Sequence, residues 1–175
     1  MGNASAMIYQ DNNDSTYKSY YKTNEKLLDL FSILPDKDKN IMIDYITNSL
    51  YNVWNKDYYL FLVSLQQNIY ISDSIKNNLI TNLDIIKENK NTNTCEKFKY
   101  IHNMILSINK EVSDFCLLDY NKRDTIINLK VESFTKNGDF ETYLLLDKLK
   151  YKDNMFQKIS TSIDQAIKRR NYYAI

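Results

Sequence analysis

The sequence predicts a mainly α-helical fold, a single-domain bundle of about seven helices. Only two glycines and one proline occur among the 175 residues, too few for the glycine-rich turns of parallel α/β folds and β-sandwiches. Over most of the chain, apolar residues recur three or four positions apart, which is the spacing of an amphipathic helix. The apolar content of 43% and the charged content of 26% are those of an ordinary globular protein.

The chain divides into a short polar segment and one domain. Residues 1–15, MGNASAMIYQDNNDS, are mostly polar, and we expect a flexible N-terminal segment there. Residues 1–6 are either native or derived from an expression vector, with Met7 as the native start in the second case. Residues 16–175 are expected to form the helical domain. A chain of this length buries roughly 70% of its unfolded surface, so the domain needs no disulfide or metal to fold.

Six stretches show the helical spacing. They cover residues 27–34, 42–54, 58–65, 75–86, 98–115 and 156–167. We expect Ser72 to be the N-cap of the fourth stretch, and Asn93 with Glu96 to form a capping box before the fifth. Trp54 continues the spacing of the second stretch, so we expect its side chain to be mostly buried between two helices.

Residues 125–149 fit two structures. In the first, a two-residue turn at Asn137-Gly138 closes a β-hairpin over residues 125–146. In the second, one helix ends just before Gly138 and another begins with Asp139 as its N-cap. The strong helix formers of the segment YLLLDKLK favour two helices, whereas a lone hairpin would have to pack on a helix to be stable.

The segment LPDKDKNIMIDYI, residues 34–46, also allows two interpretations. Asp36, Asp38 and Asn40 stand at the first, third and fifth positions of a calcium loop. Such a loop needs glycine at its sixth position and glutamate at its twelfth, where this chain has isoleucine and threonine. We therefore predict no calcium site but a helix whose first turn holds both aspartates, because carboxylates there interact favourably with the helix dipole.

Composition argues against several classes of protein. The net charge is +1, so direct binding of nucleic acid is not expected. No apolar run reaches the roughly 18 residues that span a bilayer, and the N-terminus lacks the regions of a secretory signal. Cys95 and Cys116 are too few for a disulfide framework, so we expect reduced, partly buried thiols in an intracellular, cytoplasmic protein. The abundance of Asn, Lys, Ile and Tyr indicates an AT-rich genome.

No catalytic residue, metal ligand or cofactor is predicted. His102 is the only histidine, and neither cysteine lies at contact spacing from it, as a nucleophile and its base would require. The carboxylates are scattered along the chain, and two glycines cannot build a phosphate-binding loop.

Gly2 is a candidate lipid anchor. It follows the initiator methionine in MGNASA, which is close to the N-myristoylation signal but has Ala6 where that signal has serine or threonine. Peripheral attachment to a membrane is therefore expected only if Gly2 is native and acylated. A single acyl chain would bind a membrane only weakly.

Together, these features favour a non-catalytic module that binds another intracellular protein: an adaptor, a regulator or a host-modulating helical bundle. The candidate contact residues lie at the end of the last helix: Arg169, Arg170, Tyr172 and Tyr173. Arginine and tyrosine are enriched at the hot spots of protein interfaces.

Two other functions are left open by the sequence. One is the effector or dimerisation domain of a bacterial or phage transcription regulator, to which residues 26–46 bear a loose likeness. The other is a small enzyme that uses some of the carboxylates. The sequence is also compatible with a homodimer.

Overall fold

The structure is a computed structural model that describes residues 25–67, 70–152 and 154–173. Throughout these residues the chain forms helices joined by short connections, and they contain no strand. The predicted mainly α-helical fold is therefore confirmed.

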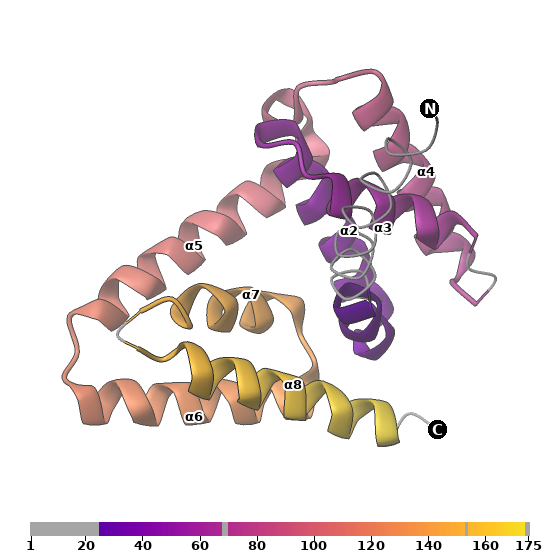
Figure 1. Ribbon diagram of the computed structural model, residues 1–175. Coiled ribbons are helices and arrows are strands. Elements are labelled where there is room, and N and C mark those ends of the chain that lie inside the picture. Colours follow the sequence, from indigo (N-terminus) through magenta and orange to yellow (C-terminus); the bar gives the residue numbers. More distant parts are fainter. Residues whose placement is uncertain (1–24, 68–69, 153, 174–175) are drawn as a thin grey trace, which may run out of the picture.

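The helices follow one another closely along the chain. After a helical segment over residues 25–33, they are α2 (Asp36–Asn52), α3 (Lys56–Gln66), α4 (Asp73–Lys87), the short 3₁₀ turns η1 (Thr92–Thr94) and η2 (Glu96–Phe98), α5 (Lys99–Cys116), α6 (Tyr120–Asn137), α7 (Phe140–Leu149) and α8 (Phe156–Tyr173). Figure 1 shows α2, α3 and α4 in one half of the molecule and α6, α7 and α8 in the other, with α5 running from one half to the other.

Helix α2 holds the two halves together, because it packs against α3, α4, α5 and α7. Its buried Met42, Ile43, Ile46 and Leu50 follow the predicted helical spacing. On another side of α2, the ring of Tyr45 meets the ring of Phe140 edge-on, with 5.7 Å between the ring centroids. Because Phe140 begins α7, this contact joins the first half of the fold to the second.

The first turn of α2 forms a second link to α7. The helix begins at Asp36, so the helical interpretation of residues 34–46 is confirmed. Asp38 Oδ1 accepts a hydrogen bond of 3.0 Å from the backbone N–H of Phe140. The first N–H groups of a helix have no partner within the helix, so the carboxylate of Asp38 stabilises the start of α7 from outside.

Residues 125–149 form two helices, and the alternative of a β-hairpin at 125–146 is wrong. Helix α6 ends at Asn137, and Gly138 follows it in the left-handed conformation with φ of 66°. Asp139 then caps α7, because its Oδ1 accepts a 2.8 Å hydrogen bond from the N–H of Thr142. Local capping thus ends one helix and starts the next within two residues.

Trp54 is exposed, so the prediction that it is mostly buried is wrong. Helix α2 ends at Asn52, and the following Val53 is extended, with φ of −143° and ψ of 112°. The helical spacing therefore stops before Trp54, and 62% of its surface remains exposed. Asn55 then starts α3 by accepting hydrogen bonds from two backbone amides.

Of the two predicted helix starts before α4 and α5, one is confirmed. Ser72 stands at the N-cap position of α4, although its side chain makes no capping hydrogen bond. The capping box of Asn93 and Glu96 is wrong, because these residues lie in η1 and η2 and α5 begins only at Lys99. The side chain of Asn91 accepts the N–H of Asn93 at 2.9 Å, which favours a tight turn there over a helix start.

Candidate functional site

An exposed apolar surface surrounds Trp54 at the turn between α2 and α3. We call Tyr51, Val53 and Trp54 the Trp54 surface. Val53 and Trp54 expose 74% and 62% of their areas. A single exposed apolar side chain needs no explanation, but neighbouring ones next to clefts are typical of interaction sites.

Two clefts share Trp54 as a wall. The first, of about 150 Å³, is lined by Leu50 and Ile85 as well as by polar groups from the loop after α4. The second, of about 430 Å³, lies along α3 and α4 and is lined by Val63 and Leu83. Ile86 lines both clefts. The indole therefore stands between two hollows with partly apolar walls.

Local contacts position the indole. Its ring lies 5.2 Å from the ring of Tyr59 in a tilted arrangement. Tyr59 is on the first turn of α3, whose start is set by the side chain of Asn55. Trp54 thus rests against α3 on one side while much of its surface faces outward.

A buried polar network lies beside the smaller cleft. Asn48 and Thr92 are both buried, and the Thr92 hydroxyl donates a 2.8 Å hydrogen bond to Asn48 Oδ1. The same oxygen lies 3.0 Å from His102 Nε2. Because a carbonyl oxygen only accepts, this contact requires the proton on Nε2. The network ties η1 and α5 to α2.

A second polar cluster joins α2 to α4. Asp44 Oδ1 accepts hydrogen bonds from Asn78 and Asn82 at 3.2 and 2.8 Å, and it lies 3.2 Å from the ammonium of Lys97. Asn82 is fully buried. Its side-chain nitrogen donates to Asp44, whereas its buried Oδ1 has no hydrogen-bond partner. The hydrogen bonds and the ion pair of the cluster join α2, α4 and η2. Together the two clusters join α2, which leads into the Trp54 surface, to α4, α5 and the two 3₁₀ turns.

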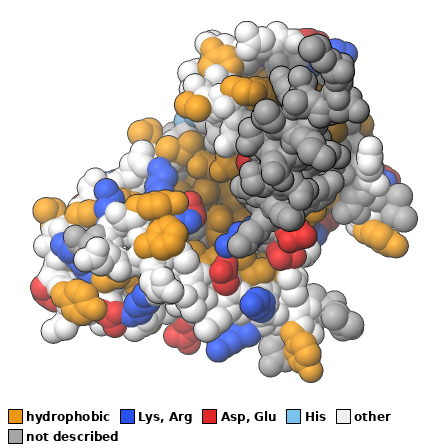
Figure 2. Space-filling model, in the orientation of Figure 1, with side chains coloured by type: hydrophobic (Ala, Val, Ile, Leu, Met, Phe, Trp, Pro, Cys, Tyr) orange, Lys and Arg blue, Asp and Glu red, His pale blue; other side chains and the backbone are white. Residues whose placement is uncertain are grey.

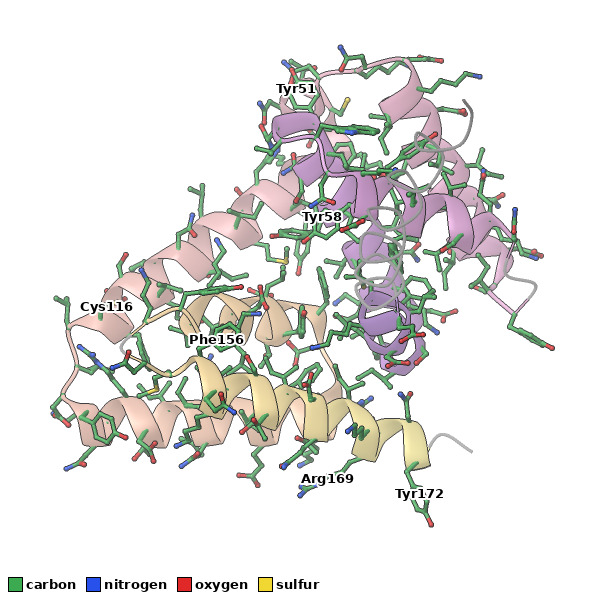
Figure 3. The ribbon with its side chains drawn as sticks, in the orientation of Figure 1. Tyr51, Tyr58, Cys116, Phe156, Arg169 and Tyr172 are labelled. Atoms are coloured by element: carbon green, nitrogen blue, oxygen red, sulfur yellow. The ribbon has the colours of Figure 1, made fainter. Side chains whose placement is uncertain are left out.

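The recess between the two halves holds a group of tyrosines. Figure 3 shows Tyr58 in this recess, and Figure 2 shows hydrophobic side chains at its bottom with charged groups along its lower border. Burial, assisted by nearby charges, raises the pKa of Tyr58 to about 12 and raises that of Tyr143 further. Burial also raises the pKa of Tyr45. The phenols therefore keep their protons to a higher pH than an exposed tyrosine does.

A cleft of about 500 Å³ adjoins this group. Tyr143 and Asp147 line it from α7, Lys150 lines it from just after that helix, and residues of α8 and of the segment 25–33 complete it. Burial opposes the charge on Lys150, but its hydrogen bond and attraction to Asp147 outweigh burial and raise its pKa. The ammonium of Lys150 is thus held beside Asp147 at the rim of the cleft.

Of the residues predicted to contact a partner at the end of α8, Arg170 does not share a surface with Arg169 and Tyr172. Arg170 points into the fold, where its guanidinium donates to the carbonyl oxygens of Ile33, Thr135 and Lys136 at 3.0–3.2 Å. Arg169 and Tyr172 are exposed, and Figure 3 shows both at the far end of α8 from Phe156.

The side chain of Tyr173, like Gly2, lies outside the described residues.

The structure gives His102 and the two cysteines separate surroundings. His102 contacts Asn48, whereas the half-buried thiol of Cys95 donates to the carbonyl oxygen of Asn91 at 3.3 Å. Cys116 is exposed at the end of α5, so the expectation of a partly buried thiol holds for Cys95 only. Within the described ranges, no three His, Cys, Asp or Glu side chains come together as metal ligands.

Sequence reasoning missed both the Trp54 surface and the buried polar network. The apolar spacing gave no signal for the network, because Ile46 and Leu50 share one side of the helix and Asn48 lies on another. The spacing of Trp54 indicated burial, so it gave no signal for an exposed surface either.

The fold and these sites define an α-helical protein with an exposed aromatic surface, whose neighbouring helices are joined by buried polar clusters. No protein-family model matches the chain, and no curated protein or solved structure matches it either. In the part of the chain that the structure describes, no helix has the length and apolar character to cross a membrane.

Proposed function

We propose that this protein is a non-catalytic interaction module that binds another protein through the Trp54 surface. The observation that supports this proposal is the position of Trp54, which is 62% exposed between two clefts with partly apolar walls. A tryptophan in this position can be covered completely by a partner whose apolar side chains enter the clefts.

The proposed occupant is an amphipathic helix of the partner. Such helices bind grooves through apolar side chains one turn apart, and the two clefts lie on either side of a single ring. Tryptophan and tyrosine are enriched among the residues that dominate binding energy. The scaffold supports this use, because the clusters around Asn48 and Asp44 hold the surrounding helices in place before any partner arrives.

The proposed partner is an intracellular protein. Both Cys95 and Cys116 are free thiols, which fits a reducing compartment. The exposed Arg169 and Tyr172 belong to a separate surface at the end of α8, and we test that surface as the competing contact site.

Photo-crosslinking in the native cells tests the proposal. A benzoylphenylalanine residue is introduced at position 54, at position 172 or, as a matched control, at Leu129, which is 59% exposed on α6. We expect one defined protein adduct from position 54 and none from position 129. The partner identified in this way is then titrated with the purified protein, and Trp54→Ser is expected to weaken binding at least about tenfold, which corresponds to ~1.4 kcal/mol.

Three outcomes would overturn the proposal: adducts of equal yield at positions 54 and 129, adducts only at position 172, or unchanged affinity of Trp54→Ser for the crosslinked partner. An adduct of twice the chain mass at position 54, together with a concentration-dependent dimer that Trp54→Ser abolishes, would assign the surface to a second copy of this chain instead.

A further inference from the structure

We draw no further inference here: the strongest candidate, the cleft of about 500 Å³ among α7, α8 and the helical segment at residues 25–33, is lined by both carboxylates and lysines that select no single class of ligand, and nothing in the described residues shows what covers it.

Discussion

At the scale of single residues, Gly138 and Arg170 depend on each other. A Cβ atom at position 138 would overlap the guanidinium of Arg170, so the guanidinium occupies the space that any other residue would need. The guanidinium cannot move away freely, because it donates to the carbonyl oxygens of Thr135, Lys136 and Ile33. It thereby satisfies carbonyl groups near the ends of two helical segments, which have no partners within the helices.

Gly138→Ala is expected to destabilise the protein by more than its backbone conformation alone explains. The left-handed conformation costs an alanine ~1–2 kcal/mol, and displacement of Arg170 from its acceptors adds to that cost. Urea denaturation of the wild type, of each single variant and of Gly138→Ala with Arg170→Ala measures both contributions. In the Arg170→Ala background, Gly138→Ala should lower the free energy of unfolding only by the cost of the left-handed backbone conformation. Equal costs in both backgrounds would show that the two residues are independent.

Trp54→Ala is expected to change the free energy of unfolding by less than ~1 kcal/mol, because the side chain is largely exposed and substitutions at the surface have small effects. The matched control is Phe61→Ala. Phe61 is fully buried and packs edge-on against Phe31 at 5.9 Å, so its loss should cost ~3–5 kcal/mol. Trp54 is the only tryptophan, so its emission reports this site directly. Blue-shifted emission that iodide does not quench would contradict the exposed position.

At the scale of secondary structure, a side chain from one helix stabilises the start of another. Asp139 caps α7 locally, while Asp38 of α2 accepts the N–H of Phe140 from a position about a hundred residues earlier in the chain. The first aspartate could be identified from the sequence around Gly138. The second could not, because nothing near residue 38 indicates that α7 will begin there.

Asp38→Ala is expected to cost ~1 kcal/mol, the typical effect of removing an N-terminal cap. The amide hydrogen of Phe140 should also exchange faster with solvent, since its acceptor is gone. Asp36→Ala is the matched control in the same turn. Its carboxylate is exposed and lies 3.5 Å from the ammonium of Lys39, and exposed ion pairs contribute ~0–1 kcal/mol. If Asp38→Ala leaves the exchange of the Phe140 amide unchanged, the contact between α2 and α7 is not formed in solution.

At the scale of the whole molecule, Tyr58 is half-buried where the two halves meet. Tyr58 comes from α3, yet its charge state is coupled to Asp147 and Tyr151 of the other half. The hydroxyl group therefore reports whether the halves remain packed together.

Stability is expected to fall at high pH. The pKa of Tyr58 is raised from 10.0 to about 12 in the folded protein, so the unfolded chain loses this proton first. The free energy of unfolding should therefore be unaffected by this group below pH 10.0 and should decrease as the pH rises from there towards about 12. Tyr143 acts in the same direction, because burial raises its pKa too.

Urea denaturation between neutral and alkaline pH measures how steeply the free energy of unfolding falls with pH. Tyr58→Phe is expected to make this fall shallower. The phenylalanine variant keeps the ring and removes only the ionisable group, so any difference is due to the hydroxyl. Identical slopes for the wild type and Tyr58→Phe would show that the tyrosine ionises equally in the folded and unfolded chains.

The sequence by itself determined the helices and several of their boundaries. Apolar spacing of three and four residues depends only on the geometry of the helix, and the ends at Gly138 and Asp139 depend on hydrogen bonds to residues a few positions away. Such short-range interactions form in much the same way whatever the rest of the chain does. This is why two helices could be favoured over a hairpin across residues 125–149.

Only the tertiary structure decided which side chains are covered. Trp54 has the spacing of a core residue but lies beyond the end of α2. Arg170 is of a residue type enriched at interfaces, but its guanidinium donates to carbonyl oxygens at the end of α6. Asn48 is polar but buried against Thr92 and His102. Burial depends on which helices pack against each other, and that is set by contacts between residues far apart in the sequence, which neither spacing nor residue type specifies.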